Sequence, residues 1–489
     1  TAYEIRPRDW SSDVCSSDLA GSGDSLLLTG NPGSTISRET YIVDATKDAG
    51  TWVVDPDGSR GAGASSAGNS DELIVNFTGL EPVASDLPAT NFDVILSAAN
   101  DNLSIENGLL TSPFTVPNLR IVDLAGTFET TTFAKKSTVR IMGSSGGDNM
   151  RVNYSTAATG LTALELIGHL AAGVSGQPAD DNLGDSMELQ QNVSTVSTTL
   201  QGGGGDDLFT SVSDNLSSIA GTVTIQGDGG SDLLQLLDSA STTADTVTVT
   251  STSIQGLAPA TFNYSTVETV KLLTASQTND TINILSTASG TQYLIGGSDR
   301  GSDKVTIGNT TADFEGNVFD GSLDSIAGPI TFLPDPNNHG DTDVLNVDDS
   351  GTASLFGSAT ISDIGLQTFS APAAGSSFQQ VTISTSGLTT KLQNFASAAI
   401  NYFHILGSNP LATNVRLETL NVRASQGADT IAINATTATL GTTISGRQGN
   451  DTFTIAGDAL SAANNIQGSD GNDDRSEEHT SELQSRGLI

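Results

Sequence analysis

The sequence predicts an all-β fold, a parallel β-helix or β-solenoid with about 22 residues in each coil. Three features favour this fold: a composition rich in turn residues, a Gly/Asp turn that recurs along the chain, and short stretches of alternating apolar residues after each turn. Glycine occupies 52 of the 489 positions, whereas aromatic residues make up only 5% of the chain. The apolar spacing typical of amphipathic helices is almost absent.

The recurring turn consists of Gly or Asn residues, an Asp, and then alternating apolar residues. Clear copies are GGGGDDLFT (202–210), GDGGSDLLQ (227–235), GRQGNDTFTI (446–455) and GSDGNDD (468–474). The aspartates give the period: Asp185, Asp207 and Asp232 are 22 and 25 residues apart, Asp280 and Asp303 are 23 apart, and Asp429, Asp451 and Asp473 are 22 and 22 apart. Asp101 and Asp148 are 47 apart, which is about two such periods.

The stretches after the turns alternate as expected for half-buried strands. Ile431 and Ile433, like Phe453 and Ile455, are expected to point inward and to stack on their equivalents one coil away. Thr430, Ala432 and Asn434 are then expected to point outward. A longer echo supports the repeat, because VETVKLLTASQTNDTINI (267–284) and LETLNVRASQGADTIAI (417–433) share their order and nearly share their spacing.

The chain is expected to contain two repeat regions between two artefactual ends. FLPDPNNHG (332–340) interrupts the rhythm with two prolines, so we expect β-solenoid regions at 20–335 and 336–474, the second with calcium-type motifs. Residues 1–19 and 475–489 are expected to be translated sequencing adapter, because DWSSDVCSSDL (9–19) and RSEEHTSELQS (475–485) can be read from reverse-complementary DNA. The single cysteine, Cys15, lies in the first of these ends.

The charge of the chain argues against two classes of partner. The formal net charge is −37, and the few Lys and Arg residues form no cluster. Nucleic acids and anionic membrane surfaces both require such clusters, so neither is an expected partner. No apolar run approaches the roughly 18 residues of a membrane-spanning helix, so we expect no membrane insertion in this fragment.

The spacing within the turn has a chemical interpretation. GGGGDDLFT matches the nonapeptide G-G-x-G-x-D-x-U-x, in which glycines permit a tight turn and present carbonyl oxygens while the Asp supplies a charged ligand. Ca²⁺ binds about six to eight oxygens, so stacked turns would have to share an ion. Aligned carboxylates about 5 Å apart repel by about 0.8 kcal/mol in water and by about 3 kcal/mol at an effective dielectric of about 20, which favours a bound cation. In the alternative interpretation, Gly, Asn and Asp are simply turn-forming residues.

These motifs resemble the haemolysin-type calcium-binding (RTX) repeats of large secreted or surface proteins of bacteria. The resemblance implies a calcium-dependent right-handed β-roll or β-helix, secreted and often adhesive. It departs from the family in having one motif in each coil of about 22 residues, whereas the family's tandem nonapeptides give about 18. The metal-ligating positions that it implies are Gly202, Gly203, Gly205 and Asp207; Gly227, Gly230 and Asp232; Gly446, Gly449 and Asp451; and Gly468, Gly471 and Asp473.

The expected function is that of a calcium-binding repeat region in a secreted or cell-surface protein, structural or adhesive and not enzymatic. Calcium ions are the expected ligand, and surface glycans or other cell-surface proteins are the expected partners. One alternative is a carbohydrate-active β-helix enzyme, a polysaccharide lyase or hydrolase. However, adjacent pairs such as Asp206 and Asp207 would face opposite ways on a strand and make a poor acid/base dyad. The other alternative is a metal-independent surface-layer or scaffold component.

Overall fold

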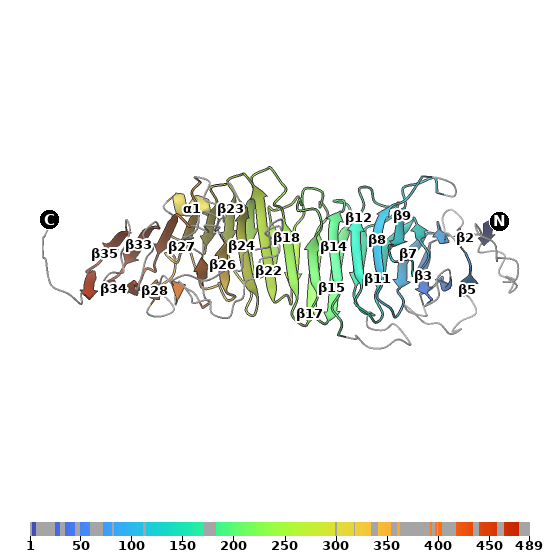
Figure 1. Cartoon of the computed structure of the whole chain (residues 1–489), viewed down its shortest axis with the longest axis horizontal. Coiled ribbons are helices and arrows are strands. Elements are labelled where there is room, and N and C mark those ends of the chain that lie inside the picture. The colour runs from blue at the N-terminus through green and yellow to red at the C-terminus, as the bar shows by residue number, and fades with distance from the viewer. Residues whose placement is uncertain are drawn as a thin grey trace, which may run out of the picture. The chain divides into compact units, whose positions relative to one another are not determined.

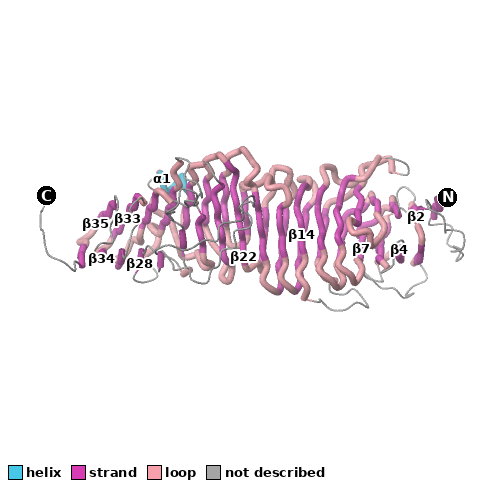
Figure 2. The backbone as a smooth tube through the Cα atoms, in the orientation of Figure 1, coloured by secondary structure: helices cyan, strands magenta, loops and turns pink. Residues whose placement is uncertain are grey.

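A computed structural model describes residues 2–5, 25–29, 35–44, 49–58, 72–80, 83–110, 114–170, 182–298, 301–316, 318–333, 341–353, 359–361, 392–393, 397–398, 400–402, 417–433, 440–456 and 464–478. The chain forms two compact units: unit 1 comprises residues 1–236 and 258–268, and unit 2 comprises residues 237–257 and 269–489. Figures 1 and 2 show strands and connecting loops in both units. Among the described residues the one helix is α1 (Thr311–Glu315), in unit 2.

Unit 1 contains two sheets in which most neighbouring strands are parallel. Its first sheet contains β1 (Ala2–Ile5), β2 (Ser25–Leu28), β6 (Val83–Ser85), β8 (Asn102–Asn107), β9 (Leu119–Asp123), β10 (Thr131–Phe133), β12 (Asn149–Asn153), β14 (Ser186–Gln191), β16 (Leu208–Ser211) and β18 (Leu233–Leu237). Its second sheet contains β3 (Ile36–Val43), β4 (Ala49–Asp55), β5 (Leu73–Thr78), β7 (Ala89–Ile95), β11 (Lys136–Met142), β13 (Ala163–Ile167), β15 (Ser197–Gly204), β17 (Val223–Gly229) and β21 (Phe262–Ser265).

The core of unit 1 is built from rows of apolar side chains that are aligned by the strand register. In β13 and β18, for example, partly exposed and buried residues alternate over the first four positions. Parallel pairing without a shift places equivalent inward residues of successive strands next to each other. One row contains Leu166, Leu200 and Ile225 of the second sheet, and another contains Met187, Phe209 and Leu234 of the first, all at most 1% exposed.

Antiparallel strands extend some turns of unit 1. β9 pairs antiparallel with both β8 and β10, while β8 also pairs directly and in parallel with β12. β4 likewise lies antiparallel between β3 and β5, while β3 pairs in parallel with β7. The antiparallel strands β9 and β4 are therefore insertions within a coil of the chain, and the parallel pairing between successive coils continues past them.

Unit 2 repeats the same architecture with its own strands. One sheet contains β22 (Thr269–Ser276), β24 (Gln292–Ser298), β26 (Ile330–Leu333), β28 (Ala359–Ile361), β29 (Leu392–Gln393), β30 (Ile400–Tyr402), β32 (Thr430–Ile433), β34 (Thr452–Ala456) and β36 (Asp474–Glu478). The other contains β19 (Thr246–Val249), β20 (Ser253–Gln255), β23 (Thr281–Ile284), β25 (Lys304–Ile307), β27 (Val344–Asp348), β31 (Thr419–Arg423), β33 (Gly441–Gln448) and β35 (Asn464–Asp470).

The inward positions predicted for unit 2 are confirmed. Ile431 lies opposite Phe453 and Ile433 opposite Ile455 in the parallel pair β32–β34, and all four side chains are buried. Thr430 is exposed, as expected for the outward face, and Asn434 lies outside the described residues. The all-β prediction is confirmed, and the parallel sheets are consistent with a β-solenoid.

Several expectations fall at the limits of the described residues. β26 ends at Leu333, and residues 334–340, where the interruption was expected, lie outside them. The strands β1 and β36 fall in or overlap the segments expected to be adapter, and they pair in parallel with β2 and β34. The proposed division at 335 and the adapter origin of the ends stay predictions. No helix of the described residues is long and apolar enough to cross a membrane.

Candidate functional site

The repeated aspartates lie at the corners where one strand of a turn ends and the next begins. In unit 1, Asp207 stands between β15 and β16, and Asp232 stands between β17 and β18. The backbone N–H of Asp207 donates to Oδ1 of Asp232 over 2.9 Å, and the N–H of Asp185 donates to Oδ1 of Asp207 over 2.7 Å. These carboxylates therefore bridge successive turns of the chain.

The same contact recurs at every corner aspartate that the structure describes in these runs, and we call the whole set the aspartate ladder. In unit 1 it also joins Asp101 to Asp148 and Asp148 to Asp185, over 2.8 and 2.7 Å. In unit 2 one run joins Asp245, Asp280, Asp303 and Asp343, and a second run joins Asp429, Asp451 and Asp473, with N···O distances from 2.8 to 3.1 Å.

A second hydrogen bond accompanies each step from one aspartate to the next. The carbonyl oxygen of Asp207 accepts the N–H of Leu233, the residue that follows the next corner aspartate, over 2.9 Å. The carbonyl of Asp429 accepts the N–H of Thr452 in the same way, over 2.8 Å. Side chain and backbone of one aspartate thus continue the parallel hydrogen-bonding pattern around the corner, where a sheet alone would leave polar backbone groups unpaired.

Glutamates replace aspartates at two steps of the ladder. The N–H of Asp232 donates to Oε2 of Glu268 over 2.8 Å, and the N–H of Asp343 donates to Oε2 of Glu418 over 2.9 Å. Glu268 and Glu418 are the glutamates of the related sequences VETV and LETL. The similarity of these two segments therefore reflects a shared structural role of the glutamates, which was not predicted from the sequence.

The residue before the corner aspartate forms a companion ladder in the opposite direction. Oδ1 of Asp206 accepts the N–H of Ser231, and Oδ1 of Asn450 accepts the N–H of Asn472, both over 2.9 Å. Oδ1 of Asn279 accepts from Ser302 over the same distance. The aspartate ladder donates toward the later turn, whereas the companion ladder accepts from it. This role was not predicted from the sequence, although the Asn-Asp and Asp-Asp pairs at the corners are visible in it.

The glycine five residues before a corner aspartate provides space for the carboxylate. A Cβ atom on Gly202 would lie 1.9 Å from Oδ2 of Asp207, and one on Gly446 would lie 2.1 Å from Oδ2 of Asp451. The same holds for Gly227 with Asp232 at 2.2 Å and for Gly468 with Asp473 at 1.9 Å. Two corners carry a serine four residues before the aspartate instead, Ser97 and Ser425, whose hydroxyls donate to Asp101 and Asp429.

The other predicted glycines shape the tight turn at each corner, and they allow the backbones of successive coils to approach closely. Gly205, Gly230, Gly449 and Gly471, two residues before their aspartates, have φ of +104°, +144°, +108° and +150°. A Cβ atom on Gly230 would lie 1.8 Å from the carbonyl oxygen of Gly205 in the neighbouring turn. Gly203 has φ of +104°. The structure therefore places all the predicted site residues at the corners, where each has a steric or hydrogen-bonding role.

Burial raises the pKa of several ladder carboxyls. The pKa of Asp232 is raised to about 6, first by burial and then by the carboxylates of Glu268, Asp206 and Asp228. The pKa of Asp303 is raised to about 8 by burial and by the nearby carboxylates of Asp343, Asp280 and Asp341. Like charges that are stacked and removed from water disfavour the ionised form, so part of the ladder binds protons near neutral pH.

The donor set at the corners can be compared with the needs of calcium. Oδ1 of each ladder aspartate after the first of its run already accepts an N–H, and no three His, Cys, Asp or Glu side chains among the described residues are grouped to hold a metal ion. Oδ2 of Asp232 and of Asp451 is buried and accepts no hydrogen bond. One such oxygen in a corner is well short of the six to eight that Ca²⁺ takes. Calcium binding stays a prediction.

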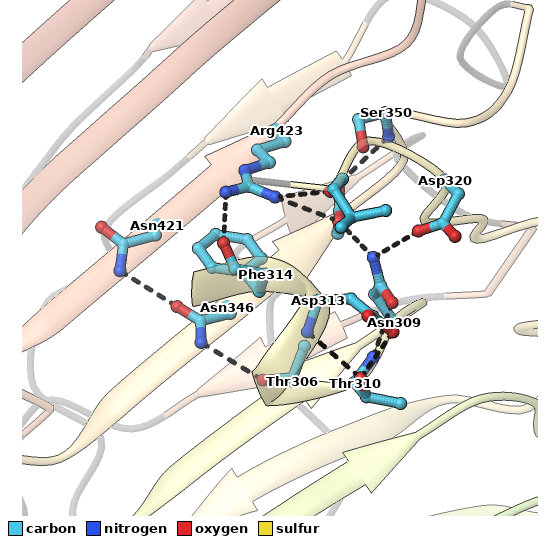
Figure 3. A network of polar contacts seen from close by, with 12 residues as sticks. Thr306, Asn309, Thr310, Asp313, Phe314, Asp320, Asn346, Ser350, Asn421 and Arg423 are labelled. Carbon is cyan, nitrogen blue, oxygen red and sulfur yellow. Dashed lines mark hydrogen bonds and ion pairs between the residues drawn. The ribbon is translucent and has the colours of Figure 1, made fainter. Parts of the chain in front are cut away.

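A separate polar cluster in unit 2 holds the helix α1 against the strands (Figure 3). The Arg423 guanidinium lies 3.8 Å from the ring centroid of Phe314, donates to the carbonyl oxygens of Phe314 and Val318, and lies 3.5 Å from Oδ2 of Asp348. Asn309 donates to Asp348 over 2.9 Å. This cluster fixes the segment around α1 to β27 and β31.

Asparagines continue the contact between strands beside this cluster. Asn421 donates to Asn346 over 3.0 Å, and Asn346 donates to Thr306 over 3.2 Å, so that amides link β31, β27 and β25 (Figure 3). Arg447 lies over the ring of Phe319, 3.3 Å from its centroid. These contacts are structural, and none of them was predicted from the sequence.

Comparison with models of known protein families finds no match for this chain, and comparison with curated protein sequences finds none either.

Proposed function

We propose that this chain is a structural repeat module of a secreted or cell-surface protein, a β-solenoid whose coils are fixed to one another by the aspartate ladder. The observation that supports it most strongly is the unbroken donation from one aspartate N–H to the next carboxylate, as from Asp185 through Asp207 to Asp232. We use the word coil for the chain between two consecutive ladder residues. A contact that recurs at one corner after another is typical of a scaffold, because no single position is chemically distinguished from the others.

The energetics of the ladder support a structural role. A hydrogen bond contributes about 0.5–1.5 kcal/mol, or about 1.5–3 kcal/mol where the acceptor carboxylate is ionised, and the ladder supplies one in each coil in addition to the backbone pairing. It also fixes the register, since a slip of one residue would turn every inward side chain of a strand outward. The adhesive part of the proposal, with surface glycans or other cell-surface proteins as partners, rests on the family resemblance.

Calcium binding is a second candidate, and one observation favours it. The carboxyl oxygens Oδ2 of Asp232 and Asp451 are buried without a hydrogen-bond donor, and Asp232 is 1% exposed. A buried ionised carboxylate needs either a proton or a cation. The raised pKa of Asp232 favours the proton, whereas the net charge of −37 favours a bound cation.

Thermal unfolding of the full chain and of two variants at Asp451 separates these candidates. Asparagine keeps an oxygen that can accept the N–H of Asp429 and resembles a protonated aspartate, whereas alanine leaves that N–H unpaired. In a metal-free ladder we expect Asp451→Ala to lower the free energy of unfolding by about 1–3 kcal/mol and Asp451→Asn to lower it much less. Circular dichroism in the presence of calcium or of a chelator gives the measurement, with Asp324→Asn, an exposed carboxyl, as the matched control.

The outcomes are distinct. If calcium raises the unfolding temperature of the wild-type chain and Asp451→Asn loses this response, the ladder is a calcium site. If calcium and chelator give identical curves and only Asp451→Ala is destabilised, the ladder is a metal-free scaffold. Equal destabilisation by both variants without any calcium response contradicts both candidates.

A further inference from the structure

A lysine and a glutamate are completely buried next to each other in unit 1. Lys136 is the first residue of β11 and Glu39 lies in β3, and both side chains are 0% exposed. The ammonium nitrogen Nζ contacts Oε2 of Glu39 and the carbonyl oxygen of Leu87, and it lies 2.8 Å from Oγ of Ser85. The two residues are 97 positions apart in the sequence.

The other carboxyl oxygen of Glu39 is held by two donors. Nε1 of Trp52 donates to Oε1 over 2.8 Å, and the Ser85 hydroxyl donates to the same atom over 2.6 Å. The two oxygens are therefore distinguished: Oε1 is fixed by neutral donors and Oε2 faces the amine.

Aromatic rings enclose the pair. Trp52 stacks on Phe92 with ring centroids 5.3 Å apart and on Tyr41 at 5.2 Å, and Nζ of Lys136 lies 5.6 Å from the centroid of Phe92. All these rings are fully buried. Burial lowers the pKa of Lys136, although the Glu39 carboxylate opposes this effect. Two opposite charges in such surroundings carry a desolvation cost of several kcal/mol for each ion, and a reaction that removes both charges removes this cost.

We propose that Lys136 and Glu39 condense to an amide, an isopeptide cross-link between Nζ and Cδ that joins β11 to β3. The proposal is independent of the function of the aspartate ladder. The chain contains a single cysteine and cannot form a disulfide within itself. The isopeptide bond would therefore provide a covalent cross-link that a disulfide cannot.

The contacts supply each requirement of the reaction. The ammonium group gives one proton to Oε2, and the two remaining hydrogens on Nζ donate to Ser85 and Leu87, which directs the lone pair toward the carboxyl group. Attack on Cδ forms the N–C bond and places negative charge on Oε1, where Trp52 and Ser85 donate. A second proton leaves nitrogen for Oε2, the bond from Cδ to Oε2 breaks, and Oε2 departs as water. Nothing is oxidised or reduced.

The mass of the folded, full-length chain tests the proposal directly. We expect the denatured wild-type protein to be lighter than its sequence by one water molecule, and proteolysis followed by tandem mass spectrometry to yield one branched peptide joining Lys136 to Glu39. The Lys136→Met variant should have the full mass of its sequence. The matched control is Lys135→Met, which removes the neighbouring, partly exposed lysine that pairs with Asp86 and should keep the loss of water.

Two results would overturn the proposal. One is a wild-type chain that shows the circular dichroism of a folded β protein and the unchanged mass of its sequence; this result needs no variant to fold. The other is a loss of water that maps to a different peptide, such as the Asp57-Gly58 sequence closing to a succinimide. A Ser85→Ala variant adds a kinetic readout: the loss of water after refolding should slow at least tenfold if Ser85 positions the amine and stabilises Oε1.

Discussion

At the scale of single residues, the glycine of the corner motif is explained by the space that it leaves for the aspartate side chain. The carboxyl group of Asp451 folds back over Gly446, where any side chain would collide with it, and its Oδ1 accepts the N–H of Asp429. Glycine at this position was predicted to present carbonyl oxygens to an ion. Its steric role follows only from the direction of the aspartate side chain, which no sequence pattern specifies.

The substitution Gly446→Ala tests this explanation. The added Cβ would lie 2.1 Å from Oδ2 of Asp451, so the carboxyl group must move and its hydrogen bond to the previous coil must weaken. We expect the free energy of unfolding to fall by about 1–3 kcal/mol, measured by chemical denaturation.

The control for this substitution lies at the start of the same strand. A Cβ on Gly441 would meet its nearest atom, the carbonyl oxygen of Glu418, at an ordinary 3.5 Å. Gly441→Ala should therefore change stability by less than about 1 kcal/mol. Equal losses for the two variants would show that the space over Gly446 has no special role.

At the scale of elements, strands were predictable and coil lengths were not. Alternation is a local property of the sequence, so the inward positions of β32 and β34 could be identified in advance. Coil length is not local: consecutive ladder residues are 22 apart from Asp185 to Asp207 but 47 apart from Asp101 to Asp148. The spacing of 47 was interpreted as two periods, and it is one coil that carries the antiparallel insertion β9.

A uniform coil of 22 residues is not confirmed, because the number of residues between consecutive ladder positions varies. The step from Asp303 to Asp343 spans 40 residues, and the step from Asp343 to Glu418 spans 75. The ladder constrains only the corner residues, and the cost of closing a longer loop rises slowly with its length. Insertions therefore change the sequence period while the hydrogen-bonded contact stays the same.

The segment that contains α1 depends on one arginine, which gives a prediction for an element. Arg423 both covers the ring of Phe314 and donates to two carbonyl oxygens of the segment. Lysine keeps the charge but lacks the planar group with several donors. In Arg423→Lys we expect amide hydrogen exchange in residues 311–319 to accelerate at least tenfold, while exchange in β13 and β15 of unit 1 stays unchanged.

The charged neighbours of that segment provide the control. Lys304 forms an exposed ion pair with Glu315 at the end of α1. Lys304→Met should leave the exchange rates of residues 311–319 nearly unaltered, because exposed ion pairs contribute little. If the amide hydrogen exchange of residues 311–319 is the same in Arg423→Lys as in the wild-type chain, Arg423 does not hold this segment in place.

At the scale of the whole molecule, the buried carboxyls make stability depend on pH. Burial, together with neighbouring carboxylates, raises the pKa of Asp232 to about 6, of Asp245 and Asp349 to about 7, and of Asp303 to about 8. An unfolded aspartate has a pKa of about 4, so the folded chain binds more protons than the unfolded chain between about pH 4 and 8. The resulting stabilisation is complete below about pH 4 and is lost as the pH rises through 6 to 8.

Thermal unfolding at constant ionic strength should therefore give a higher unfolding temperature at about pH 5.5 than at about pH 8.5. The Asp303→Asn variant should show a shallower dependence, because its amide does not titrate and the raised pKa of Asp303 is lost. A wild-type unfolding temperature that rises with pH over this range would show that the ladder carboxyls are ionised in the folded chain.

The direction of the aspartate ladder has a consequence for synthesis. In every step the donor N–H precedes its acceptor carboxylate in the sequence, as Asp429 precedes Asp451 and Asp451 precedes Asp473. A nascent chain leaves the ribosome with its earlier residues first, so the newest finished corner always has an N–H whose acceptor has not yet been translated. Each coil is completed only when the next coil has been made. Until then, the backbone N–H of the most recently made corner aspartate stays available to the next segment of chain.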